Sequence, residues 1–455
     1  MVADSLLQRI RRHAVLSAAV TVTLFSPSIL AEDARPSAPV DGATVQRLIE
    51  RVDKQDAEIK DLKSKLAEKA PGSPAPAGTR DPINLRLDKQ DAEIKEVKAK
   101  VAAAVAKDAA ADEGTFPTLS FHGFGDVDYH TSSQKEDKNA FTLGELDLFV
   151  TSQLAPDISI LNEDVIAAGS DNHFSIEIER LLVQFRTSEY LNVDVGRYHT
   201  AVGYYNTAFH HGTWFQTAVG RPQIVNFEDS GGVIPVHQVG VSVHGTIPGA
   251  PTKLGLSYFA ELGNGRQYTT NGNSPVGNVF DNNNYKAVNL AVIARPESLP
   301  GVQLGAGIYH DTLNPEGVAR TSEDIVHAHL VYHNKDWEFL SEGFALHHST
   351  QNGPDTWSPA FYVQLSRKFG KITPYARFTY LNAADSDQIY QLIGQSGRHY
   401  GPSVGVRYDL SDFVALKAQY DYESNSSAYV DPGPTFNPIA RQSLSRFTLQ
   451  LAFTF

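Results

Sequence analysis

The chain has 455 residues, of which 41% are hydrophobic, and it combines a formal net charge of −13 with no cysteine. The absence of cysteine excludes disulfides, thiolate chemistry and anchoring as a lipidated lipoprotein. The modest apolar content does not exclude a membrane protein, because a β-barrel alternates lipid-facing and water-facing side chains and so dilutes its apolar residues.

The amino terminus has the pattern of a secretory signal peptide over residues 1–31. Basic residues, among them Arg11 and Arg12, precede an apolar run over residues 14–25, and small residues suited to cleavage follow as far as Ala31. No later segment offers the roughly 18 consecutive apolar residues that a membrane-spanning helix needs. We therefore expect an exported protein that could cross a membrane only as a barrel.

Residues 32–115 contain two nearly identical segments, 52–60 and 87–95, in which apolar residues are spaced as in a heptad repeat. The a and d positions are Val45, Leu48, Val52, Gln55, Ile59, Leu62 and Leu66 in the first copy, and Leu87, Gln90, Ile94, Val97 and Val101 in the second. One helix cannot bury so narrow a seam, so we predict a homotrimeric coiled coil in the periplasm, with a Pro/Gly/Ala linker at 71–78. The alternative is that each copy forms a single solvated helix.

From about Thr118 to the end of the chain, apolar residues recur at every second position. Val239, Val241 and Val243, for example, alternate with polar or small residues. Short connections alternate with long polar ones at about 264–284, 382–398 and 424–442. This asymmetry predicts an all-β transmembrane antiparallel β-barrel of about 16 strands over residues 116–455, with tight turns at one end and longer loops at the other. The alternative is a soluble multi-domain β-protein.

The last nine residues, 447–455, alternate strictly between apolar and polar or small side chains and end on Phe455. This ending resembles the terminal signal of bacterial outer-membrane barrels. The resemblance implies that the barrel-assembly machinery is a partner of the chain through Phe455, and that the barrel lies in outer-membrane lipid.

A segment at about residues 200–235 is rich in aromatic residues and glycine, and it connects two expected strands. A loop of this length and composition seldom extends freely into solvent. We predict that it folds into the barrel and narrows the pore.

Four features together resemble the trimeric outer-membrane porins of the phosphate-selective porin group: the Gly196 to Gly203 stretch, the long loop, the amino-terminal coiled coil and the Phe455 terminus. The resemblance implies a homotrimeric channel and, where that family is anion-selective, a ladder of arginine and lysine side chains along the pore. The charge departs from this expectation. From residue 116 onward, 21 Lys plus Arg stand against 34 Asp plus Glu, so this part alone carries 21 − 34 = −13. That balance argues against phosphate selectivity.

Charged and histidine side chains on the polar strand faces and in the loop are candidates for lining or constricting the pore. The predicted set is Glu145, Asp147, Arg197, His199, His210, His211, Arg221, Glu228, Asp229, Lys368, Arg377, Arg407 and Lys417. Opposed acids and bases across a constriction would orient dipolar solutes. For any one of these residues, the alternative is a solvated charge in the lumen or at the rim.

Two pairs of histidines could approach a metal ion, His210 with His211 and His327 with His329. The sequence offers no third ligand for either pair. We therefore predict no metal site and no cofactor, and nothing in the sequence indicates a nucleic-acid partner.

The predicted function is passive diffusion of ions and small hydrophilic solutes through a water-filled channel in the outer membrane. The alternatives are an anion- or phosphate-selective channel, and a structural tether whose coiled coil contacts peptidoglycan. An enzyme is not expected, because the sequence has no Gly-x-Ser-x-Gly element and no persuasive Ser/His pair. A trimeric autotransporter is excluded by length, because about 340 residues follow the coil, enough for a complete barrel in each chain.

Overall fold

The computed structural model describes residues 116–134, 139–169, 173–209, 211–228, 231–267, 278–315, 317–425 and 442–455. The predicted signal peptide at 1–31 and the predicted coiled-coil region at 32–115 lie outside the described residues. So do two of the predicted site residues, His210 and Asp229.

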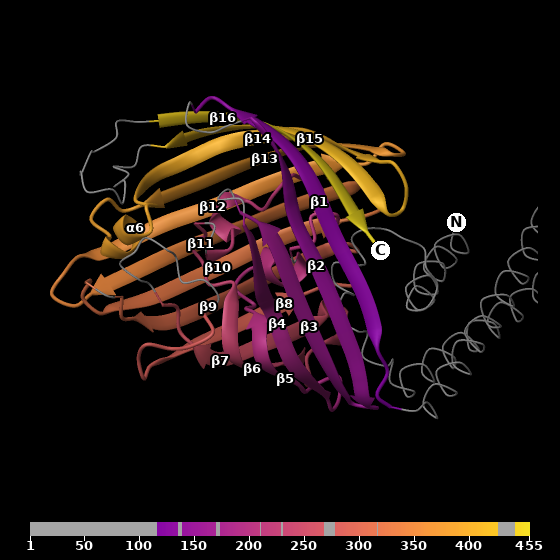
Figure 1. The fold of residues 1–455 in the computed structure, drawn as a ribbon. Coiled ribbons are helices and arrows are strands. Elements are labelled where there is room, and N and C mark those ends of the chain that lie inside the picture. Colours follow the sequence, from indigo (N-terminus) through magenta and orange to yellow (C-terminus); the bar gives the residue numbers. More distant parts are fainter. Residues whose placement is uncertain are drawn as a thin grey trace, which may run out of the picture. The chain divides into compact units, whose positions relative to one another are not determined.

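Sixteen strands form one closed sheet in which each strand is antiparallel to its neighbours in chain order, and β1 pairs with β16 (Figure 1). They are β1 (Ser120–Ser132), β2 (Ala140–Ala155), β3 (Ile158–Ala168), β4 (Phe174–Arg186), β5 (Asn192–His199), β6 (His237–Thr246), β7 (Leu256–Asn264), β8 (Lys286–Ala294), β9 (Val302–Leu313), β10 (Thr321–His333), β11 (Trp337–Thr350), β12 (Asp355–Arg367), β13 (Ile372–Ala383), β14 (Gly397–Asp409), β15 (Val414–Asn425) and β16 (Gln442–Thr454). The predicted antiparallel barrel of about 16 strands is confirmed.

The connections differ in length at the two ends of the barrel. Those that follow even-numbered strands are short, as at residues 334–336 between β10 and β11, whereas those that follow odd-numbered strands include long loops such as 384–396 between β13 and β14. The loops hold short helical turns: α5 (Tyr205–Ala208), η1 (Gln223–Val225), η3 (Thr252–Leu254) and α6 (Gln388–Leu392). In the described part of the chain, no helix combines the length and apolarity needed to cross a membrane.

The strand faces are polar inside and apolar outside. On β16 the side chains of Phe447, Leu449 and Leu451 are 37–39% exposed, whereas the intervening Thr448 and Gln450 are buried. The same alternation of exposed apolar and buried polar side chains recurs along β12 and β14. This is the reverse of a soluble β-protein, which buries its apolar face. The predicted soluble alternative does not fit this arrangement.

The final residue helps to close the barrel. Phe455 donates its backbone N–H to the carbonyl of Gly123 (3.0 Å) and accepts from the N–H of Gly123 (3.1 Å). A Cβ at residue 123 would lie only 2.2 Å from the Phe455 ring, so the absence of a side chain at Gly123 leaves room for that ring. Backbone pairing between β1 and β16 then leaves no open strand edge for other chains to join.

Candidate functional site

The connection between β5 and β6, hereafter the inserted loop (residues 200–236), packs against strands on several sides of the barrel. Thr213 donates to Asp126 on β1 (3.1 Å), the N–H of Ala201 donates to Glu261 on β7 (2.9 Å), and the N–H of Tyr205 donates to Glu342 on β11 (2.9 Å). Because β1, β7 and β11 stand far apart around a closed sheet, a segment that reaches all three lies in the lumen (Figure 1).

The inserted loop brings its own apolar core into this polar lumen. Its buried apolar side chains include Val202, Tyr205, Phe209, Trp214, Phe215, Ile224, Val225, Val233 and Ile234. Phe215 also packs on Phe124 of β1, with ring centroids 4.4 Å apart. Burial of each large apolar side chain contributes about 1.5–3 kcal/mol. The loop is therefore a packed body inside the barrel rather than a solvated segment.

Arg221 organises the loop from within. Its guanidinium donates to the carbonyls of Val225 (2.6 Å) and Phe209 (3.0 Å) and to the side-chain oxygen of Asn206 (2.9 Å). It also stacks 4.3 Å above the ring of Phe227. The sequence analysis placed Arg221 in the constriction, and the structure uses this side chain to tie distant parts of the loop together.

Three basic residues on adjacent strands hold one stretch of the loop, and we call them the basic cradle (Arg377 on β13, Arg407 on β14 and Lys417 on β15). Arg377 donates to the carbonyls of Gly220 (2.8 Å) and Val219 (3.3 Å). Arg407 donates to the carbonyls of Trp214 and Gln216, and Lys417 donates to those of Thr213 and Ala218. These bases therefore bind loop backbone, an arrangement that spacing along the strands could not reveal.

Glu342 on β11 anchors the start of the loop. Its fully buried carboxylate accepts from the N–H groups of Tyr204 and Tyr205 and from the hydroxyl of Tyr362 (2.7 Å). The backbone of Gly203 has a φ of +88°, and a Cβ there would lie 2.3 Å from a Glu342 oxygen. Glycine is needed here both for the left-handed backbone and for the close approach.

We predict that Glu342→Gln lowers the free energy of unfolding by about 1–3 kcal/mol, because the amide nitrogen cannot accept and leaves one buried donor unpaired. Urea unfolding followed by tryptophan fluorescence measures the change. Glu297→Gln, at an exposed position in the β8–β9 turn, is the matched control and should stay within about 0.5 kcal/mol of the parent. Equal stabilities for the two variants would contradict the anchoring role.

A second group of side chains converges at another point of the barrel wall, and we call it the histidine–carboxylate cluster. It consists of Glu179 on β4, His211 in the loop and His237 at the start of β6. The Nε2 of His211 lies 3.2 Å from the Glu179 carboxylate, and the Nε2 of His237 contacts the same oxygen. Burial lowers the pKa of His211, but the carboxylates of Glu145 and Glu179 outweigh it and raise this pKa well above its usual value. The cluster joins the loop to two strands.

A β-bulge positions the carboxylate of this cluster. Glu163 on β3 pairs with Arg180, whereas the next residue, Asp164, pairs with Ile178, so Glu179 is the extra residue on β4. The bulge turns Glu179 and Arg180 inward together, and both are buried. Simple alternation would send one of these two adjacent residues outward.

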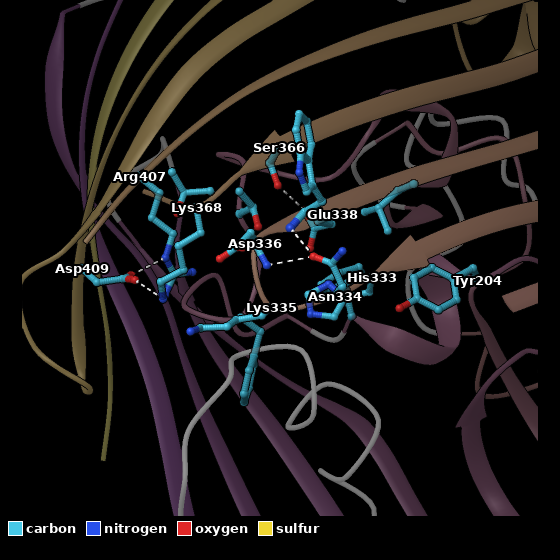
Figure 2. Close-up of a pocket in the computed structure, with 16 residues that line it drawn as sticks. Tyr204, His333, Asn334, Lys335, Asp336, Glu338, Ser366, Lys368, Arg407 and Asp409 are labelled. Atoms are coloured by element: carbon cyan, nitrogen blue, oxygen red, sulfur yellow. Dashed lines mark hydrogen bonds and ion pairs between the residues drawn. The ribbon is translucent and has the colours of Figure 1, made fainter. Parts of the chain in front are cut away.

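A pocket enclosing about 750 Å³, part of it open to solvent, lies between the loop and the wall near the short turns. Tyr204 and Phe209 of the loop line it together with charged residues of the turns (Figure 2). Among these charged residues, Asp409 accepts from Lys368 (3.0 Å) and from Arg407 (2.8 Å). The pocket is a polar space beside the loop, lined by both signs of charge.

The remaining predicted residues lie close to the histidine–carboxylate cluster. Glu145 pairs with His211 (2.9 Å), Glu228 pairs with His237 (2.9 Å), and Arg197 pairs with Glu177 (2.9 Å). Asp147 and His199 are buried on the inward face of the same wall. Lys368 lies apart from this group, in the pocket described above.

Several loop-binding residues escaped the sequence analysis: Asp126, Glu179, His237, Glu261 and Glu342. Alternation alone would have placed Glu342 and Glu261 on inward faces. His327 and His329 bind different partners, because His327 accepts from the N–H of Gly203 and His329 bonds to Gln303. Of the other histidine pair, only His211 belongs to the described residues, and it faces His237.

No protein-family model matches the sequence, and neither does any curated protein. Among solved structures, the chain is similar to an anion-selective porin from Comamonas acidovorans, with 13% identity, 75% of this chain and 100% of that chain covered, and a TM-score of 0.52. It is also similar to OmpF of Salmonella typhi in complex with daunomycin, with 11% identity, 74% and 98% covered, and a TM-score of 0.51. The likeness concerns the fold alone, and by that measure the chain shares the barrel fold of outer-membrane porins.

Proposed function

We propose that this chain is an outer-membrane porin, a water-filled channel for the passive diffusion of ions and small hydrophilic solutes. One observation carries the proposal: a closed barrel of sixteen strands, apolar outside and polar inside, holds an ordered loop across its lumen. An apolar outer face suits lipid, and a barrel of this size leaves room for water beside a loop. The inserted loop is then the constriction that limits solute size.

The arrangement of charge favours a general, cation-leaning channel over an anion ladder. Several inward guanidinium groups are paired with carboxylates, as in Arg180 with Glu163, Arg197 with Glu177, and Arg266 with Glu323, and those of Arg221 and Arg377 are taken up by oxygen atoms of the loop. A ladder for anions needs basic side chains whose charge is offered to the permeating ion. The acidic excess of the barrel segment points the same way.

The test is a planar-bilayer recording with the purified full chain, first of single-channel conductance and then of the reversal potential under a salt gradient. We expect stepwise openings and a cation-leaning reversal potential. An anion-leaning potential would instead favour an anion- or phosphate-selective channel. Absence of conductance from correctly folded protein would reject the channel and leave the structural tether as the function.

We also propose that the chain forms a homotrimer in which the amino-terminal coiled coil takes part. The heptad spacing supports this, and so does the channel function. Deleting residues 45–105 separates the roles of the coil. Loss of the trimer on native gels assigns the coil to assembly, whereas an intact trimer with unchanged conductance and a detached envelope in cells assigns it to contact with peptidoglycan.

A further inference from the structure

The histidine–carboxylate cluster has the composition and convergence of a metal site. One oxygen of Glu179 and one ring nitrogen from each of His211 and His237 lie within 4.8 Å of one another, and all three residues are buried. Both ring nitrogens contact the Glu179 oxygen, and none of the three atoms has a further hydrogen-bond partner in the described structure. Three buried polar atoms that face one another and hydrogen-bond to no other group form a ligand set for one cation.

One ligand spacing already suits a small tetrahedral ion. Zinc binds imidazole nitrogen and carboxylate oxygen at about 2.0–2.2 Å, which puts neighbouring ligand atoms of a tetrahedron about 3.3 Å apart. The carboxylate oxygen of Glu179 and the Nε2 of His211 are 3.2 Å apart, whereas the Nε2 of His237 contacts the same oxygen, so the Glu179 carboxylate has to shift away from that ring to admit an ion. Two imidazoles and one carboxylate form a donor set that zinc and other divalent transition metals accept.

Contacts made by the Nδ1 atom of each ring orient both imidazoles for metal binding through Nε2. The Nδ1 of His211 lies 2.9 Å from a carboxylate oxygen of Glu145, and the Nδ1 of His237 lies 2.9 Å from one of Glu228. An ionised carboxylate only accepts, so each Nδ1 carries a proton, and each Nε2, the atom turned toward Glu179, would release its own proton when an ion binds. Metal-binding histidines are held by such carboxylates in this way.

Other groups hold the outer carboxylates and the rings in place. Glu228 also accepts from the N–H groups of Val236 (2.6 Å) and His237 (2.9 Å). The ring of His211 stacks on Phe227, with centroids 3.8 Å apart and planes 3° from parallel. The rings are therefore fixed before any ion arrives, which lowers the ordering cost of binding.

The charge around the cluster also favours a divalent cation. Glu145 pairs with His211 and Glu228 pairs with His237, so a divalent ion bound to neutral imidazoles would replace the positive charge that protonated rings supply to these carboxylates. Arg197 is the nearest competing cation, with its Nη2 3.7 Å from Glu179, and it also pairs with Glu177. A guanidinium at that distance does not occupy the space between the two imidazoles.

We propose that Glu179, His211 and His237 bind one divalent transition-metal ion, represented by Zn²⁺, which fastens the inserted loop to the barrel wall. The ligands come from β4, from the loop and from the residue at which the loop rejoins the wall as β6. A single ion therefore links the interior of the loop and its carboxy-terminal end to a strand outside it. This role is independent of solute passage, so it stands or falls separately from the channel function.

The test is zinc binding by the full chain, produced without a polyhistidine tag, folded in detergent and stripped with a chelator. Isothermal titration with zinc chloride is expected to give one site per chain. Glu179→Gln and His237→Gln should each weaken binding by roughly 100-fold or more, and Glu228→Gln by roughly 10–100-fold. His122→Ala, which removes an exposed histidine on β1, is the control and should bind as the parent does.

Two further measurements distinguish a metal site from a metal-free cluster. Cobalt binding by the parent should give the strong visible absorption of a tetrahedral ion, and this band should be absent in His237→Gln. Heat-dependent gel migration shows that each variant is folded. Two outcomes would overturn the proposal: the folded parent protein binds no stoichiometric zinc, or the ligand variants bind zinc as tightly as the parent does. In either case the cluster would consist of two protonated imidazoles around the Glu179 carboxylate.

Discussion

Replacing the whole basic cradle by methionine, in the triple variant Arg377→Met, Arg407→Met and Lys417→Met, is expected to raise the single-channel conductance by a factor of about two. The three side chains donate to the backbone carbonyls of six loop residues: Thr213, Trp214, Gln216, Ala218, Val219 and Gly220. Hydrogen bonds from charged donors are worth about 1.5–3 kcal/mol each. Methionine keeps the unbranched apolar stem of these side chains and donates to none of the carbonyls.

The loss reaches beyond the hydrogen bonds. Arg407 also stacks over the ring of Trp214, at 5.4 Å from its centroid, so the triple variant removes a packing contact of the loop core. Without the basic cradle, loop residues 213–220 can move away from the barrel wall. The constriction then widens toward the full cross-section of the barrel. Conductance in planar bilayers, together with the permeability of vesicles to sugars of increasing size, measures the change.

Lys371→Met is the control for loss of a basic side chain outside the cradle, because Lys371 lies exposed in the β12–β13 turn and, among the described residues, its side chain donates only to the carbonyl of Leu410. It should keep the parent conductance and the parent size limit. If the folded triple variant also keeps both, the cradle does not hold the constriction.

The second large effect is expected in stability, from Glu323→Gln. Glu323 on β10 is fully buried and accepts from Arg266, which belongs to the β7–β8 loop, and from His348 on β11 (2.8 Å). His348 in turn pairs with Asp387, the residue that caps α6 (2.8 Å). The network thus ties two long loops to the wall of the barrel.

Glutamine has nearly the shape of glutamate, so the substitution removes the charge while leaving the packing intact. Arg266 would then be a buried cation without its carboxylate, which costs about 3–5 kcal/mol. Urea unfolding, followed by the fluorescence of the three tryptophans, measures the difference.

Lys286→Gln is the comparison for this variant. Lys286 pairs with Asp281 at 2.6 Å, but its side chain is 43% exposed, and an ion pair in contact with solvent is worth about 0–1 kcal/mol. A Glu323→Gln protein whose unfolding free energy falls no further than that of Lys286→Gln would show that the buried network adds no more than a surface pair.

The local pattern of side chains was sufficient to predict the strands. Period-two alternation depends only on the geometry of a strand, in which successive side chains point to opposite faces. The faces of Glu145, Lys417 and Leu451 could therefore be assigned before any fold was known. Alternation fails at the bulge of β4, where the adjacent residues Glu179 and Arg180 both face inward.

The sequence by itself thus determined the architecture of this protein: about sixteen alternating strands, short turns at one end and long loops at the other, and one long aromatic loop. Only the tertiary structure decided what the inward residues do. Arg407 and Trp214 are far apart in the chain, and so are Glu342 and Tyr205, yet closure of the sheet brings each pair into contact. Closure depends on strand pairing around the whole barrel. No local stretch of sequence therefore predicts which side chains will meet across the lumen.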